Sequence, residues 1–285
     1  MSLFIPKNHS IEAKKQGLWN LFLPHELPLH IPKAAIAHDK NKSITYSLAP
    51  LHILSNREYG ILCEVMGKSF VCPEACNCSA PDTGNMEVLL KHGSKSQQTK
   101  YLIPLLKGEI RSTFLMTEPD VASSDATNIQ STLTKRIQNT PNKQSSNIVT
   151  YQLNGRKWWS TGAMDPRCKV AIVLTRMDYS HPSCLLPKQK NTKNNVTSDL
   201  KKKEHGAHTM VIVSMNAKGV NLVRPLTVFG YDDAPHGHAE VLLDKVELDE
   251  SSLLLGEGKG FVIAQSRLGP GRIHHCMRAV GLGKP

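Results

Sequence analysis

The spacing of apolar residues changes twice along the chain, and these two changes restrict the fold more than any other feature of the sequence. Over residues 51–108 apolar side chains recur at near-helical spacing, and Gly108 is placed to end the last helix. Residues 149–243 instead contain short strand-like runs separated by Pro, Gly and Asp. Helical spacing resumes after the glycine-rich segment 256–260. The sequence therefore predicts an α+β fold in which a β domain lies between two helical segments.

One segment of the β region is typical of a hairpin. Apolar and polar residues alternate over residues 149–153, Asn154-Gly155 is a dipeptide favoured in two-residue turns, and residues 157–160 follow it. This pattern predicts two antiparallel strands joined by a tight turn. Further strands are expected at residues 170–175, 210–214, 219–223 and 239–243.

Three domains and two insertions follow from these patterns. We expect an N-terminal helical domain over residues 1–112, incomplete at its start, a middle β domain over 113–250 and the start of a C-terminal helical domain over 251–285. The polar segments 138–147 and 180–208 are expected to be loop insertions on the sheet.

The composition argues against several classes of protein. With 285 residues and 40% hydrophobic content the chain can bury a core. It contains no run of roughly 20 uncharged apolar residues, so no membrane span is expected. Its 7 cysteines are an odd number scattered through a large chain, which favours a reducing compartment. Cys72, Cys76 and Cys78 form a cluster without the second ligand pair of a zinc site, so no metal is expected.

The net charge of +11 fits an anionic partner, either a nucleic acid or a phosphorylated small molecule. Six of the lysines lie in one polar segment, residues 188–203, which has no aromatic residue and no nucleic-acid-binding motif. Such a segment is typical of a solvated loop. Nucleic-acid binding is therefore not expected.

Two segments carry groups suited to ligand binding. Residues 114–125 run from an apolar strand into a dense cluster of hydroxyl and carboxylate side chains, which is either a capped turn or a set of ligand contacts. In residues 157–162 a pair of indoles precedes two hydroxyls. A flat indole beside small donors suits a planar ring ligand, whereas simple strand alternation would turn one indole to the core and the other to solvent.

Four long motifs occur in a fixed order: MTEPDVASSDATNI, NGRKWWSTGA, VFGYDDAPHGHAEV and LGPGRIHHCMRAVG. Together they resemble the acyl-CoA dehydrogenase family, most of all its subgroup of family members ten and eleven, over residues 71–282. The resemblance implies an N-terminal helical domain, a middle β domain of barrel or sandwich type and a C-terminal four-helix bundle. Only the first helix of that bundle would lie in this chain, which is thus expected to be a C-terminally truncated member.

The resemblance implies FAD as cofactor, with its isoalloxazine ring between the β domain and the bundle. Backbone amides near Met116 and the Thr117 hydroxyl would hydrogen-bond the pyrimidine edge of the ring. Thr161 would lie near N5, and the Trp159 indole would cover one side. The residues that match the two flavin-contacting stretches of the family are Phe114, Met116 and Thr117, and Trp159, Ser160 and Thr161.

An acyl-CoA substrate is implied as well. Ser124 matches a serine that contacts both the flavin and the thioester region, and Ser123 is an alternative because this segment is one residue longer than in common members. Arg272 matches a basic residue near the bound acyl-CoA, where a cation suits a phosphorylated ligand. A solvated helical arginine is the alternative for Arg272.

No catalytic base is assigned within the chain. The family removes the α-proton of the thioester with a glutamate while a hydride passes to the flavin, and in most members that glutamate would lie beyond Pro285. In others it precedes the arginine matched by Arg272, where this chain has Gly271, and no carboxylate follows Glu257. We expect an inactive truncated dehydrogenase, a subunit complemented by another chain, or a non-catalytic remnant that binds flavin or acyl-CoA.

The remaining expectations rest on the resemblance alone. It implies a role in fatty acid β-oxidation and lipid metabolism, and assembly into a homodimer or homotetramer. The electron acceptor would be electron-transferring flavoprotein or oxygen, in mitochondria or peroxisomes respectively. The sequence itself displays no targeting signal, so the compartment is inferred from the family.

Overall fold

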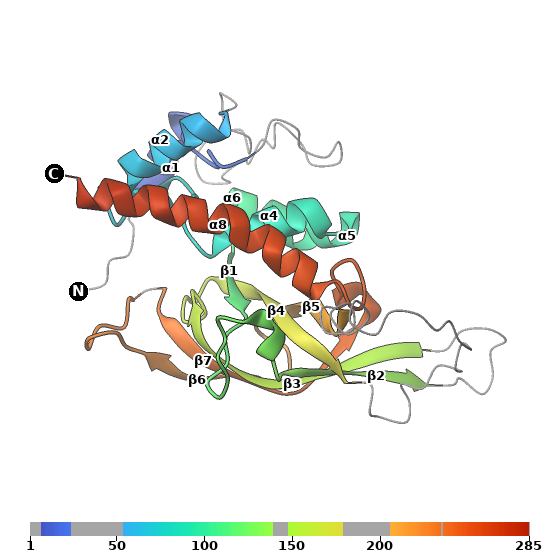
Figure 1. The fold of residues 1–285 in the computed structure, drawn as a ribbon. Coiled ribbons are helices and arrows are strands. Elements are labelled where there is room, and N and C mark those ends of the chain that lie inside the picture. The colour runs from blue at the N-terminus through green and yellow to red at the C-terminus, as the bar shows by residue number, and fades with distance from the viewer. Residues whose placement is uncertain (1–6, 24–53, 139–147, 179–205, 235, 285) are drawn as a thin grey trace, which may run out of the picture. The chain divides into compact units, whose positions relative to one another are not determined.

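The computed structural model describes residues 7–23, 54–138, 148–178, 206–234 and 236–284 (Figure 1). The chain divides into two compact units, which we call the helical unit (Met1–Ser112 with Gln265–Pro285) and the β unit (Thr113–Ala264). In the described segments no helix is long and apolar enough to cross a lipid bilayer.

Short helices with defined ends make up the helical unit. They are α1 (Lys7–Lys15), α2 (Asn56–Gly67), α3 (Cys72–Ala75), α4 (Asp82–His92), α5 (Lys95–Gln97), the π-helical turn η1 (Gln98–Leu102), α6 (Ile103–Lys107) and, from residue 265 on, α8 (Gly260–Gly283). Ser55 and Glu58 form a capping box that begins α2. Gly108 adopts a left-handed conformation (φ +71°) and ends α6, as predicted from the sequence. The predicted helix after residues 256–260 is confirmed as α8.

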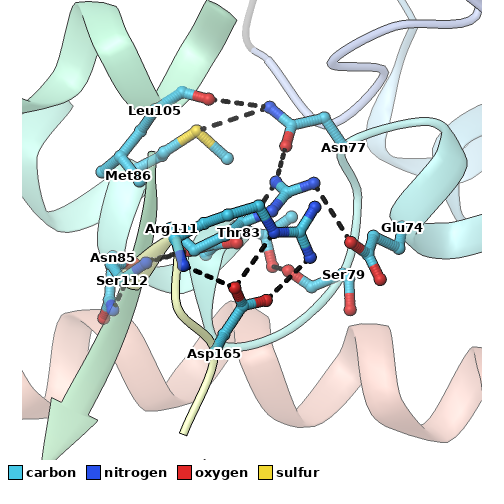
Figure 2. A network of polar contacts seen from close by, with 12 residues as sticks. Glu74, Asn77, Ser79, Thr83, Asn85, Met86, Leu105, Arg111, Ser112 and Asp165 are labelled. Atoms are coloured by element: carbon cyan, nitrogen blue, oxygen red, sulfur yellow. Dashed lines mark hydrogen bonds and ion pairs between the residues drawn. The ribbon is translucent and has the colours of Figure 1, made fainter. Parts of the chain in front are cut away.

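A buried arginine ties several of these helices together. The Arg111 guanidinium lies 3.3 Å from Asp82 and 3.4 Å from Glu74, and it donates to Asn77 Oδ1 at 2.5 Å. Asp82 also accepts hydrogen bonds from the amide and hydroxyl of Ser112. Figure 2 shows Arg111 with Glu74 and Asn77 converging on it. Because a buried charge is stable only when it is paired, this network fixes the position of residues 111 and 112 relative to α3 and α4.

Seven strands form one sheet in the described part of the β unit. The hydrogen-bonded order is β1-β4-β2-β3-β7-β6, and β5 pairs with β4. The β2–β4 pair is parallel, and the β2–β3, β3–β7, β6–β7 and β4–β5 pairs are antiparallel. The elements are β1 (Arg111–Leu115), η2 (Ala126–Asn128), β2 (Thr132–Gln138), β3 (Ile148–Thr161), β4 (Cys168–Asp178), β5 (His208–Ser214), β6 (Val220–Leu226), β7 (His238–Asp249) and η4 (Glu250–Ser252).

Alternate side chains of these strands build the core of the β unit. On β3 the buried apolar residues are Tyr151 and Leu153, which are separated by a half-exposed Gln152. The core also contains Val211 and Val213 of β5 together with Val241 and Leu243 of β7. The strands predicted at residues 170–175, 210–214, 219–223 and 239–243 are confirmed in β4, β5, β6 and β7. The segments predicted as insertions, 138–147 and 180–208, lie outside the described residues except at their ends.

The predicted hairpin at Asn154-Gly155 is wrong. Strand β3 runs without a turn from residue 148 to 161, and its register against β7 shifts between Leu153 and Gly155. The Asn154 side chain accepts a hydrogen bond from the Lys245 amide of β7 at 2.8 Å. A Cβ atom on Gly155 would lie 2.1 Å from Ser131 Oγ, so glycine is required here for a close approach and not for a turn.

Gly155→Ala tests this reason for the glycine. We expect the substitution to lower the free energy of unfolding by about 2 kcal/mol, since the added methyl group overlaps the Cα, Cβ and Oγ atoms of Ser131. The measurement is urea-induced unfolding followed by circular dichroism. Gly271→Ala is the matched control, because a Cβ there meets no atom within 4 Å and a helical alanine is favoured over glycine. Equal stability of wild type and Gly155→Ala would contradict the close-approach argument.

Candidate functional site

A bulge in β3 forms the centre of the site. The register of β3 against β7 shifts again between Lys157 and Ser160, so both indoles lie in an irregular stretch. Trp159 has a left-handed backbone (φ +50°), which is uncommon for a bulky residue and is a feature of functional sites. Trp159 is 39% exposed and Trp158 is half-buried. The bulge, rather than simple strand alternation, therefore sets the direction of both indoles.

Two hydrogen bonds join this bulge to the chain that follows β1. The Trp158 amide donates to the Thr117 carbonyl at 3.1 Å, and Thr117 Oγ1 donates to the Trp158 carbonyl at 2.6 Å. Phe114 and Met116, on the same segment, are half-buried. The structure thus brings together the two stretches that the sequence predicts to face one ligand. The Thr117 hydroxyl proton is engaged within the protein, which leaves its oxygen lone pairs for a ligand.

Thr161 lies directly opposite His238 in the register of β3 and β7. Its Oγ1 is 3.0 Å from His238 Nδ1, and its carbonyl accepts a hydrogen bond from the Thr113 hydroxyl at 2.9 Å. The His238 ring stands edge-on to the Trp159 indole with centroids 5.9 Å apart. These contacts hold Trp159 and Thr161 on a shared patch around the imidazole.

Ser160 lies between these two residues and is buried. Its hydroxyl has no hydrogen-bond partner among the described residues. A buried hydroxyl without a partner costs free energy, which is offset when a ligand or water supplies the hydrogen bond. Ser160 thus marks the bulge as a place where a polar group is expected.

A buried ion pair holds the start of the bulge in place. Lys157 Nζ is 2.8 Å from Glu118 Oε1, and both side chains are almost fully buried. The same ammonium donates to the carbonyls of Met116 at 3.1 Å and Leu174 at 2.7 Å. Lys157 thereby connects β3 to the segment after β1 and to β4.

The Glu118 carboxylate is held equally firmly. It accepts hydrogen bonds from the Gln130 amide at 2.7 Å and from the Ser131 amide and hydroxyl at 2.9 and 2.6 Å. Burial acts to raise the pKa of Glu118, but Lys157 and these donors together keep it below its ordinary value. Burial lowers the pKa of Lys157 to about 8, against the opposing influence of Glu118. The pair is a structural support with defined charges, not an exposed reactive group.

The structure assigns different roles to the two candidate serines. Ser123 Oγ accepts from the Glu118 amide at 2.8 Å and lies 3.1 Å from the Glu118 carbonyl, so it closes the turn. Ser124 is exposed. The geometry therefore favours Ser124 over Ser123 as the residue that faces a ligand.

Arg272 is exposed on α8 and belongs to the helical unit, so it stays a prediction separate from the patch in the β unit. In the described part of the chain, no group of three or more His, Cys, Asp or Glu side chains is arranged to hold a metal ion.

Comparison with known proteins agrees with the motifs. Residues 113–246 match the acyl-CoA dehydrogenase middle domain. The chain is 45% identical to a probable acyl-CoA dehydrogenase, IBR3, of Arabidopsis thaliana, in an alignment that covers 94% of the chain. It is 44% identical to human acyl-CoA dehydrogenase family member 11, in an alignment that covers 95% of the chain. A solved structure of a putative acyl-CoA dehydrogenase from Mycobacterium abscessus matches 96% of the chain at 40% identity with a TM-score of 0.72.

The chain belongs to the acyl-CoA dehydrogenase family. The α+β fold expected from the sequence is confirmed by the family match and by the described strands and helices. The chain spans 29% of the length of the Arabidopsis relative, 28% of the human one and 54% of the solved bacterial chain.

Three residues of the candidate site were not identified from the sequence as parts of it. Glu118 and His238 give no local signal, because each acts through a residue that is distant in the chain. Lys157 did give a signal. It lies an even number of residues from the core residues Tyr151 and Leu153, so strand alternation points its side chain toward the core. A lysine buried in this way requires a carboxylate partner.

Lys157→Met tests the ion pair. We expect a loss of about 3–5 kcal/mol in the free energy of unfolding, because Glu118 is left buried without its cation. Lys169→Met, at an exposed position of β4, is the control and should change stability by less than about 0.5 kcal/mol. Chemical unfolding of the three proteins gives the comparison. If Lys157→Met were as stable as Lys169→Met, the ion pair would not be a structural support.

The pH dependence of stability provides a second test. Because the folded-state pKa of Glu118 lies below its ordinary value of 4.5, its contribution is present above that value and is lost as the pH falls through the folded pKa. The stability difference between wild type and Glu118→Gln should therefore be largest near neutral pH and shrink in acid. A difference that stays constant as the pH falls would contradict the assignment.

Proposed function

We propose that the β unit binds FAD and that the enzyme to which this chain belongs carries out the α,β-dehydrogenation of acyl-CoA thioesters. The observation that carries the proposal is the junction between Thr117 and Trp158, which sets two ligand-facing stretches side by side next to the left-handed Trp159. Family membership supports the choice of ligand, since acyl-CoA dehydrogenases use FAD.

The residues present fit an isoalloxazine ring. The indole of Trp159, 39% exposed, offers a flat apolar face, and Ser160 and Thr161 follow it directly on β3, the Ser160 hydroxyl being buried without a partner in the described residues. A planar ring with a polar edge needs this combination of stacking surface and small hydrogen-bonding groups. When bound, FAD supplies the acceptor for the hydride that leaves the β-carbon of the substrate.

The chain's own residues would bind and orient the cofactor. Trp159 would cover one side of the ring and exclude water from it, and Thr161 would contact the ring nitrogen that accepts the hydride. Donors near Met116 would face the pyrimidine edge, where negative charge collects on reduction. The Lys157–Glu118 pair holds these groups in position, so little reorganisation is needed when the ligand binds.

The substrate side of the proposal rests on Ser124 and Arg272. Both are exposed, and a hydroxyl and a cation are suitable contacts for a thioester carbonyl and a phosphorylated carrier. We assign no general base among these residues, since Gly271 stands directly before Arg272. Homo-oligomeric assembly, transfer of electrons to electron-transferring flavoprotein or oxygen, and a mitochondrial or peroxisomal location are parts of the same proposal.

Gly271, at the position where some family members carry the glutamate, favours an alternative function. The chain would then bind flavin or acyl-CoA without turnover, or would act as a subunit completed by another chain. Turnover of acyl-CoA with an artificial electron acceptor distinguishes a working dehydrogenase from a chain that only binds its ligands. Loss of a general base lowers the rate by about 10²-fold or more, so a chain without one should show almost no turnover.

A FAD titration tests the proposed function. We expect the purified chain to quench flavin fluorescence and to retain flavin absorbance after desalting. Trp159→Ala should weaken FAD binding about tenfold, which corresponds to about 1.4 kcal/mol of lost stacking. Thr150→Val, near the other end of β3, is the control and should bind as wild type does. A chain that is folded but does not bind FAD would refute the proposal.

A further inference from the structure

The Thr161 hydroxyl is shared with a histidine that has its own charged neighbour. Thr161 Oγ1 and His238 Nδ1 are 3.0 Å apart, and the other ring nitrogen, Nε2, lies 3.6 Å from Asp233 Oδ2. The His238 side chain is 22% exposed and Asp233 is 65% exposed. Threonine, imidazole and carboxylate thus form a line from the proposed ligand surface to the solvent.

We propose that His238 is a positioning residue that sets the direction of the Thr161 hydroxyl proton and thereby decides whether Thr161 donates to, or accepts from, the bound ring. This inference rests on the proposed function, because the ring is taken to be that of a flavin. It adds a residue that acts on the ligand through Thr161 without contacting the reacting atoms.

Two protonation states of His238 give two states of Thr161. When His238 carries a proton on both nitrogens, Nδ1–H donates to Oγ1, and the hydroxyl proton of Thr161 turns toward the ligand. When His238 is neutral with its proton on Nε2, Nδ1 accepts the hydroxyl proton, and Thr161 offers only lone pairs. Asp233 favours a proton on Nε2 in both states, because its carboxylate faces that nitrogen.

Among the described residues, few other groups near His238 can titrate. Its uncharged neighbours are Thr161 and Trp159 from β3 and Leu226 from β6. Asp233 lies in the preceding loop. Two residues along β7 is Glu240, which pairs with Arg156 and Arg224. Glu240 is paired with both arginines, so Asp233 is the described carboxylate within ion-pair distance of the imidazole. The arrangement of protons on the His238 ring is therefore what sets the direction of the Thr161 hydroxyl.

A consequence for ligand affinity follows. The ring nitrogen of oxidised flavin that accepts hydride also accepts a hydrogen bond, so it prefers Thr161 as a donor. Oxidised FAD should accordingly bind more tightly when His238 is protonated. We expect the dissociation constant of oxidised FAD to be about fivefold lower at about pH 5.5 than at about pH 8.

The experiment measures the dissociation constant of oxidised FAD for the full chain across this pH range. His238→Gln keeps a side chain that can donate or accept but does not titrate, so the fivefold change should disappear. Asp233→Asn removes the carboxylate that holds a proton on Nε2, so the neutral imidazole can place its proton on Nδ1 instead, and the difference in affinity between the two pH values should shrink. His236→Gln is the matched control, because His236 lies in the same loop but pairs with Asp165, 3.5 Å away.

A second readout needs no ligand. The edge-on contact between His238 and Trp159 should make the tryptophan fluorescence of the free chain titrate with the imidazole, and His238→Gln should abolish this titration. FAD affinity that does not change with pH, or a change that persists in His238→Gln, overturns the inference alone. Failure of the folded chain to bind FAD at any pH overturns the proposed function and the inference with it.

Discussion

The rest of the β unit depends on the buried ion pair between Lys157 and Glu118. A charge inside a sheet is tolerable only when every part of it is satisfied, and this pair meets the requirement with two carbonyls on the ammonium and three donors on the carboxylate. These partners come from the segment after β1, from the two residues just before β2 and from β4. Apolar side chains of similar volume would fill the same space but would not select one register. We infer that the pair selects the position of β3 relative to β4 and to the segments that follow β1 and precede β2.

That register explains two features which look unrelated in the sequence. Gly155 is needed because Ser131, one of the donors to Glu118, approaches the backbone of β3 too closely for any side chain. The bulge at Trp159 follows Lys157 directly, so the strand leaves its regular pairing just after its most firmly held residue. Strain in the left-handed Trp159 is thus balanced by a rigid neighbour, which is the usual condition for such a conformation to persist. The site residues are positioned by sheet interactions and not by a loop alone.

How well the sequence predicts this arrangement depends on how far apart in the sequence the interacting residues lie. Strands β4 to β7 and the helix after residue 260 were predictable, because apolar period is a local property. Asn154-Gly155 misled because the same dipeptide suits both a tight turn and a bulge, and only the approach of Ser131 decides between them. The site stretches at 114–117 and 159–161 were found through family motifs. His238 and Glu118 were not, since their roles depend on cross-strand neighbours that only the register defines.

The segment from Arg111 to Glu118 shows how the first of the two stretches of the candidate site is held in place. It is anchored at its start by the carboxylates around Arg111 within the helical unit and at its end by Lys157 within the β unit. Between these anchors Thr117 makes two further hydrogen bonds to Trp158. Because Thr117 and Glu118 are already held within the β unit, this part of the segment has little conformational freedom left to lose when a ligand binds. Buried charge, which adds little to stability on balance, is here the means of preorganising a site.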